Sequence, residues 1–228
     1  MFKRIFITML SAVFIFSARG EEIFILPDPD PAAQVPWNLT ELMSTPQVFP
    51  APAFETEQGI TPLFYQGEKF KGKETRIFAW VGIPEGPGPF PGMVLVHGGG
   101  GTAYKDWVQL WVKRGYAAIA MDTAGHIPVR PEGQKRGWML HEHCGPRGWG
   151  GFDQMNDPVR DQWIYYAVAA VIRGHSLLRS YDQVDASRIG LTGISWGGHL
   201  TCITAGLDDR FRFAAPVYGC GFLGEDSS

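Results

Sequence analysis

The sequence has 228 residues, of which 45% are hydrophobic and 19% are charged, the composition of an ordinary globular protein with one core. Its formal net charge of -3 provides no basic surface of the kind that nucleic acids or anionic membranes require. We therefore expect neither a nucleic acid nor a membrane surface as a partner.

The first stretch of the chain, residues 1–20, has the three-part pattern of a secretory signal peptide. Lys3 and Arg4 precede an apolar run at 5–16, and a small-x-small cleavage site ends at Gly20. A membrane anchor or a core helix is the alternative, but the run is shorter than the about 20 residues that span a bilayer. No later stretch is long and apolar enough to span one. The pattern predicts a secreted or periplasmic protein without stable membrane insertion.

Residues 21–75 are rich in proline and weakly periodic. This pattern is more typical of an extended segment that wraps around a domain than of an independent domain. The prolines include Pro27, Pro29, Pro31, Pro36, Pro46, Pro50 and Pro52. From Arg76 onward the texture changes to short apolar runs that alternate with helical periods. We expect residues 76–228 to form the domain.

This domain reads as an alternation of strands and helices. The run at 93–96 is continuously apolar, as expected of a parallel strand buried on both faces. The predicted strands are 76–83, 93–96, 116–121, 188–192 and 211–217. The predicted helices are 107–115, 196–205 and, between them, a long helix with Asp157 as N-cap and Pro158 as N1. The alternation predicts an α/β fold with a mostly parallel sheet and helices on both faces.

The segment 123–156 has no convincing period, and long segments of this kind are often lids or binding loops. It follows the carboxyl end of a strand, where open α/β sheets bind ligands. His141 and His143 could form a metal pair, but no regular element sets their spacing, so a loop facing substrate or solvent is favoured. Trp138 and Trp149 either stack on a sugar or, as is commoner, pin the loop to the core.

The pattern Gly193-Ile194-Ser195-Trp196-Gly197 lies between a predicted strand and a predicted helix. In this context G-x-S-x-G forms a sharp turn that exposes the serine hydroxyl, and the glycines remove Cβ atoms where the backbone crosses itself. The N-terminus of the following helix directs its dipole and N–H groups at the reacting oxygen. Ser195 is therefore the predicted nucleophile.

A second motif, His97 followed by the glycines of residues 98–101, comes directly after the predicted strand 93–96. Bare glycine backbone lets an amide approach a substrate carbonyl oxygen, so Gly98 and Gly99 are candidate oxyanion residues. The second donor is the N–H of Trp196. We expect His97 to support the loop and not to act as the catalytic base. The alternative is a plain flexible glycine turn.

Together these motifs resemble the α/β-hydrolase superfamily. Residues 185–198 are similar to the elbow of acetylxylan esterases, dienelactone hydrolases and prolyl-oligopeptidase-type peptidases, and residues 208–217 resemble the strand that follows it. The likeness covers residues 76–220. It implies a serine hydrolase that cleaves a small-molecule or carbohydrate ester through an acyl-enzyme, with no metal and no cofactor.

The chain departs from the superfamily in its catalytic histidine. The order Ser, Asp or Glu, then His is expected, but the only histidine after Ser195 is His199, one helical turn away. Asp208 and Asp209 fit a helix-to-strand turn better than an acid site. We therefore expect the acid, the histidine and the last strands to lie beyond Ser228. A peptidase and an inactive or purely binding hydrolase-fold fragment remain as alternatives.

Two further interpretations concern single residues. Asp122, at a predicted strand end, is expected to bind the backbone of the following loop and to take no part in chemistry. Cys202 in a helix and Cys220 after a strand are expected to be packed in the interior.

Overall fold

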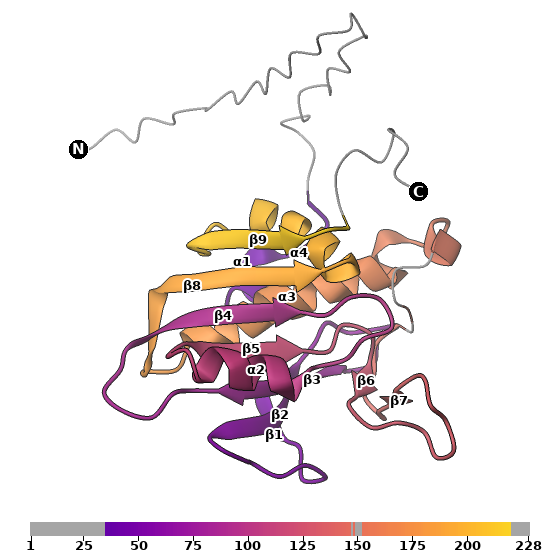
Figure 1. Cartoon of the computed structure of the whole chain (residues 1–228). Coiled ribbons are helices and arrows are strands. Elements are labelled where there is room, and N and C mark those ends of the chain that lie inside the picture. The colour runs from indigo at the N-terminus through magenta and orange to yellow at the C-terminus, as the bar shows by residue number, and fades with distance from the viewer. Residues whose placement is uncertain (1–34, 147, 149–151, 220–228) are drawn as a thin grey trace, which may run out of the picture. The chain divides into compact units, whose positions relative to one another are not determined.

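The computed structural model describes residues 35–146, 148 and 152–219 (Figure 1). The predicted signal peptide, Trp149 and Cys220 lie outside these residues. The main strands are β1 (Val48–Pro50), β2 (Ile60–Gln66), β3 (Arg76–Gly82), β4 (Phe90–Val96), β5 (Ala117–Met121), β8 (Val184–Ile194) and β9 (Phe213–Val217). The helices are α1 (Leu39–Leu42), α2 (Lys105–Val112), α3 (Trp163–Arg179) and α4 (Trp196–Leu207).

The main strands form one seven-stranded sheet in the order β1-β2-β3-β5-β4-β8-β9. The strands β5, β4, β8 and β9 are mutually parallel, and β3, β2 and β1 continue the sheet from β5, each antiparallel to its neighbour. Successive parallel strands of this sheet are connected by the helices α2, α3 and α4, which explains the alternation in the sequence. The predicted α/β fold is confirmed.

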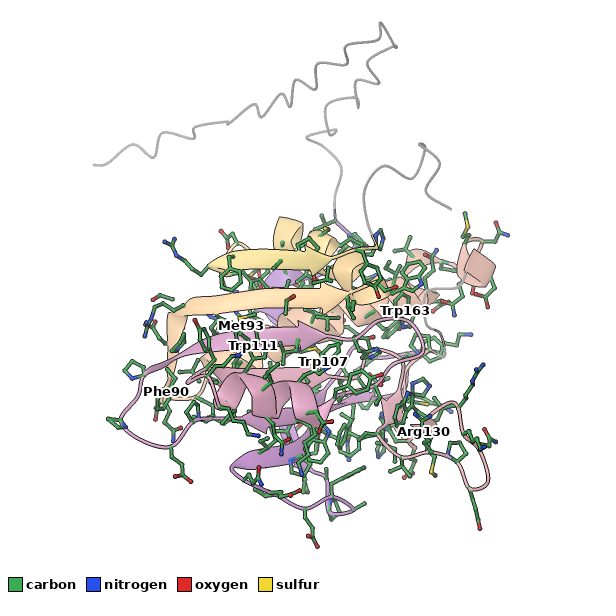
Figure 2. All side chains as sticks on the ribbon, viewed as in Figure 1. Phe90, Met93, Trp107, Trp111, Arg130 and Trp163 are labelled. Carbon is green, nitrogen blue, oxygen red and sulfur yellow. The ribbon has the colours of Figure 1, made fainter. Side chains whose placement is uncertain are left out.

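The central strand β4 is buried on both faces, because helices cover the sheet from either side (Figure 1). Val94 and Val96 belong to the core cluster that contains α3 and α4 residues. Met93 belongs to the opposite cluster, against which Trp107 and Trp111 of α2 pack (Figure 2). Successive strand residues point to opposite faces, so a strand covered twice must be apolar throughout.

The proline-rich segment contains two strands, β1 and β2, that its sequence pattern does not predict. β2 pairs with β3 along its whole length, from Ile60 opposite Gly82 to Gln66 opposite Arg76. The described part of the segment, from residue 35 onward, therefore extends the sheet through β1 and β2.

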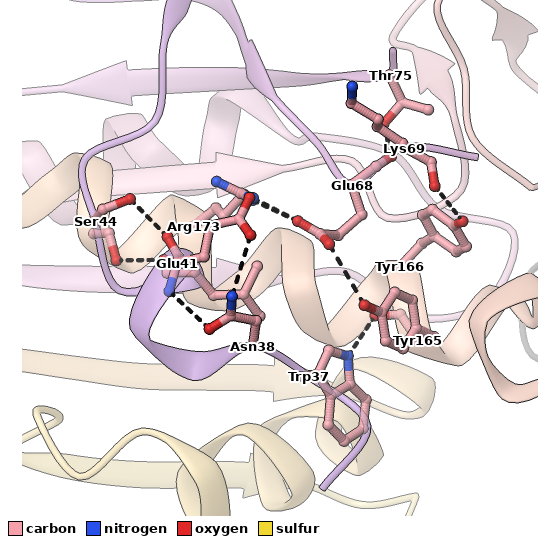
Figure 3. Close-up of polar contacts among 12 residues, drawn as sticks. Trp37, Asn38, Glu41, Ser44, Glu68, Lys69, Thr75, Tyr165, Tyr166 and Arg173 are labelled. Atoms are coloured by element: carbon pink, nitrogen blue, oxygen red, sulfur yellow. Dashed lines mark hydrogen bonds and ion pairs between the residues drawn. The ribbon is translucent and has the colours of Figure 1, made fainter. Parts of the chain in front are cut away.

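An ion-pair cluster fastens this segment to α3 (Figure 3). Arg173, whose side chain is 3% exposed, donates from Nε to Glu68 at 3.1 Å and from Nη2 to Glu41 at 3.0 Å. The indole of Trp37 donates to the Tyr165 carbonyl at 2.9 Å. These contacts join residues more than 90 positions apart in the chain.

The predicted start of the long helix at Asp157 and Pro158 is wrong. Pro158 has ψ 139°, outside the helical region, and only a short 3-10 turn, η2 (Val159–Asp161), follows it. The helix α3 begins at Trp163, whose backbone N–H donates to the side-chain oxygen of Gln154 at 2.6 Å. A side chain nine residues away thus satisfies one of the first helical amides, which local patterns do not reveal.

The long segment after β5 contains a small hairpin, β6 (His126–Ile127) paired antiparallel with β7 (Met139–Leu140), and a 3-10 turn, η1 (Phe152–Gln154). The residues between β6 and β7 project beyond the sheet (Figure 1). Across the described part of the chain, no helix has the length and apolar character needed to cross a membrane.

Candidate active site

Ser195 occupies the turn between β8 and α4 in a backbone conformation that side chains rarely adopt. Its φ is 56° and its ψ is -120°. The turn is held by the Ser195 N–H, which donates to Val217 O of β9 at 2.9 Å, and by the His199 N–H, which donates to Ser195 O at 3.0 Å. A strained residue maintained by its surroundings is common at functional sites.

Glycines are required on both sides of Ser195, because other backbone segments occupy the space of their missing side chains. A Cβ at Gly193 would lie 2.3 Å from Gly197 O, and a Cβ at Gly197 would lie 2.3 Å from Val96 O. Neither contact is sterically allowed. The turn therefore lies directly against the end of β4.

The glycine loop of residues 98–101 begins at that same strand end and lies beside the serine. A Cβ at Gly98 would be 3.3 Å from Ser195 Cβ and 3.0 Å from Ile194 O. Gly99 is exposed, and its N–H donates to no residue that the structure describes. The two motifs, about 100 residues apart in sequence, therefore meet at adjacent carboxyl ends of parallel strands.

His97 sets the orientation of this loop. Its Nε2 accepts a hydrogen bond from the Thr123 N–H at 2.9 Å, so the ring proton lies on Nδ1, which donates to Gly98 O at 2.7 Å. Gly98 O also accepts the Gly101 N–H. Because the C=O and N–H of a trans peptide point in opposite directions, the Gly99 N–H points away from His97.

His97 is neutral in this arrangement. Burial lowers the pKa of its ring and outweighs the opposing influence of Asp122, whose Oδ2 lies 3.6 Å from Nε2. A ring that accepts a bond through Nε2 and donates through Nδ1 supports the loop and has no nitrogen left to act as a base.

Asp122 binds the backbone of the following loop, as predicted. Its Oδ1 accepts the N–H groups of Ala124 and His126, each at 2.8 Å. Trp163 continues the support, since its indole donates to Thr123 O at 2.6 Å and its ring meets the Trp196 ring edge-on at 5.8 Å. These contacts of Thr123 and Trp163 join residues 26 and 40 positions apart, so no local pattern in the sequence points to them.

Trp196, the predicted second oxyanion donor, lies beside Ser195, and so does His199, which was not expected to act as the base. Trp196 opens α4, directly after Ser195, so its N–H belongs to the first turn of the helix. His199 lies one turn along, with its ring against the Trp196 ring at 5.5 Å. Among the described residues, neither a histidine nor a carboxylate is hydrogen-bonded to the Ser195 hydroxyl.

Asp208 lies at the opposite end of α4, at its C-cap. It is buried and binds His175 Nδ1 at 2.8 Å and Arg210 Nη2 at 2.7 Å. Burial raises its pKa, but the bonds from Arg210 and His175 outweigh burial and hold the pKa well below its usual range. The expectation of a helix-to-strand turn at this residue is met.

Among the residues that the structure describes, no group of three or more His, Cys, Asp or Glu side chains could hold a metal ion. His141 packs against Phe64, with ring centroids 4.9 Å apart, and burial lowers its pKa to about 4. The expectation that Cys202 is packed in the interior is wrong, because this side chain is exposed on α4.

The sheet order, the glycine elbow and the paired glycine loop define the class of protein: it is an α/β hydrolase. The chain belongs to the acetyl xylan esterase family (AXE1), whose model matches residues 60–225. The predicted resemblance is thus confirmed at the level of the family.

The chain is similar to acetyl xylan esterases of known structure and to a mammalian thioesterase. An acetyl xylan esterase from Paenibacillus sp. R4 is 28% identical, with a TM-score of 0.53 over 78% of this chain. Acetyl xylan esterase 1 from Thermoanaerobacterium sp. JW/SL YS485 has a TM-score of 0.57 at 19% identity, which shows the fold. Acyl-coenzyme A thioesterase 2 of Mus musculus is 27% identical over 64% of the chain.

The chain spans only part of these relatives. It covers 56% of each of the two esterase structures and 26% of the mouse thioesterase.

Proposed function

We propose that this protein is an exported serine hydrolase that removes acyl groups, acetyl above all, from carbohydrate esters. The observation that carries the proposal is the strained Ser195 at the N-terminus of α4, with the bare Gly98 backbone packed against its Cβ. Membership of the acetyl xylan esterase family supports the acyl group and the carbohydrate. The n-region, apolar run and cleavage site of residues 1–20 support export.

In the proposed reaction, the Ser195 hydroxyl attacks the ester carbonyl carbon and a histidine base accepts its proton. The N–H groups of Gly99 and Trp196 bind the oxyanion of the tetrahedral intermediate, helped by the dipole of α4. The alcohol leaves with a proton, and water then hydrolyses the acyl-enzyme. Each amide donor of this kind contributes on the order of a hundredfold or more to the rate.

The test, made on the full-length protein, compares Ser195→Ala with a matched control, Ser187→Ala, on p-nitrophenyl acetate and acetylated xylan. Ser187 lies on the same strand β8, exposed, and its hydroxyl bonds Asp185. We expect Ser195→Ala to lose at least about a thousandfold in kcat/KM and Ser187→Ala to keep the wild-type value. A wild-type rate in Ser195→Ala would overturn the proposal.

Two other acyl compounds decide the substrate class. The likeness to an acyl-coenzyme A thioesterase makes an acyl-CoA the natural competitor, and an acyl-peptide amide tests the peptidase alternative. We expect the acetylated sugar to have the highest kcat/KM. If acyl-CoA or the amide is turned over faster, that compound and not the carbohydrate ester represents the substrate class.

A further inference from the structure

The glycine loop of residues 98–101 depends on outside contacts for its shape. Its residues have no side chains to pack, and Gly100 has φ +71°, a conformation that glycine adopts freely. The only backbone hydrogen bond within the described loop runs from Gly101 N to Gly98 O. Without further contacts, the Gly99 amide would sample many orientations, because an unpacked glycine has a large conformational entropy.

Two side chains hold the carbonyls on either side of the Gly99 residue. His97 binds Gly98 O from within the motif, as described above. Trp138, which lies 38 positions along the chain, donates from its indole Nε1 to Gly100 O at 3.0 Å. The loop is therefore fixed at one end by the core and at the other by the segment between β6 and β7.

Trp138 is itself held in place. The guanidinium of Arg130, labelled in Figure 2, lies 4.2 Å from the centre of the indole ring and donates to Gly137 O at 3.3 Å. The Tyr104 ring meets the indole edge-on at 6.4 Å. The Met139 N–H donates to Val129 O at 2.8 Å and closes the base of the projection. The indole N–H thus points in a set direction.

We infer that Trp138 is a positioning residue for the oxyanion donor: by holding Gly100 O, it keeps the Gly99 amide aimed at the reacting carbonyl. This inference rests on the proposed function. Oxyanion donors are effective only when they are oriented in advance, since reorienting them during the reaction costs free energy. The projection between β6 and β7 is accordingly a part of the catalytic apparatus that contributes no reacting atom.

The test replaces Trp138 with phenylalanine, which keeps an aromatic ring under Arg130 and removes the N–H. We expect kcat on p-nitrophenyl acetate to fall about tenfold, less than the loss of a whole donor, with KM changed less than about twofold. A boronic acid that forms a tetrahedral adduct with Ser195 should bind more weakly by a similar factor, while Tm stays within about 2 °C.

The matched control is Trp111→Phe. Trp111 has the same kind of neighbours, the Arg114 guanidinium at 5.6 Å and the Tyr116 ring at 5.1 Å, but lies on α2 away from the glycine loop. We expect wild-type kcat from it. If Trp138→Phe is poorly folded, benzothienylalanine at position 138 keeps the shape of the indole and removes only the N–H, and the same loss of kcat is expected.

A kcat within twofold of wild type in either folded Trp138 variant would overturn the inference while leaving the proposed function intact. So would a change confined to KM or to Tm, because that is the mark of a merely structural contact. A wild-type rate in Ser195→Ala would instead overturn the proposed function and this inference with it.

Discussion

The His97 ring joins the glycine loop to the end of β5, because Nε2 accepts the Thr123 N–H at 2.9 Å while Nδ1 binds Gly98 O. His97→Leu fills similar space but leaves the buried Thr123 N–H without an acceptor. We expect a loss of about 1–3 kcal/mol in the free energy of unfolding, measured by urea titration. His143→Leu, in the long segment, should change it by less than about 0.5 kcal/mol. Equal effects of the two would contradict the proposed link.

Stability should fall in mild acid, because burial lowers the pKa of His97, His141 and His175 in the folded protein. The unfolded chain, with histidine pKa values near 6.5, then binds more protons than the folded one. The stabilisation is complete above about pH 6.5 and is lost as the pH falls toward the folded pKa values.

Urea titrations between pH 8 and pH 4 measure this loss. The His141→Gln variant should show a shallower decline between about pH 6.5 and pH 4, since the folded pKa of His141 is about 4. Identical slopes for the variant and the wild type would show that His141 does not contribute.

Substitution by alanine should have opposite effects on stability at two glycines of α4, Gly197 at the elbow and Gly206 near the other end of the helix. In Gly197→Ala the new Cβ would lie 2.3 Å from Val96 O and 2.6 Å from His97 O, which are backbone atoms that cannot move away. We expect insoluble or strongly destabilised protein. Gly206→Ala meets nothing within 4 Å and should stabilise the helix by about 0.5–1 kcal/mol. Thermal melting of both variants checks the pair, and a well-folded Gly197→Ala protein would refute the backbone crossing.

The strained backbone at Ser195 implies a trade-off between stability and activity at this position. At φ 56° and ψ -120° a residue with a Cβ is strained, and glycine is not. Both Ser195→Gly and Ser195→Ala remove the hydroxyl and should be inactive. The free energy of unfolding of Ser195→Gly should nevertheless be about 1 kcal/mol higher than that of Ser195→Ala. The reverse order would mean that the turn relaxes without strain.

The ion pair under the N-terminal segment should be important for stability (Figure 3). Arg173 is 3% exposed, and Arg173→Met leaves Glu68, whose side chain is 18% exposed, without its partner. We expect a loss of about 3–5 kcal/mol in the free energy of unfolding. Glu41→Gln, at a side chain 56% exposed, should lose less than about 1 kcal/mol. Similar losses in both variants would show that burial does not determine how much this ion pair contributes to the free energy of unfolding.

The amino-acid sequence by itself determined the α/β fold, the strand that leads to Ser195, the helix that follows it and the glycine loop after β4. These features depend on local pattern: a doubly buried strand must be continuously apolar, and a backbone crossing must have glycine. The binding of the loop backbone by Asp122 could be predicted for the same reason, since its partners lie two and four residues away.

Only the tertiary structure decided which distant residues hold the candidate site in place. The pairing of β2 with β3, the start of α3 at Trp163, and the bonds from Thr123 to His97 and from Trp138 to Gly100 O all join segments that no periodicity relates. A hydrogen bond formed after folding depends on where a whole segment packs, and the identity of a single threonine or tryptophan carries no record of that position.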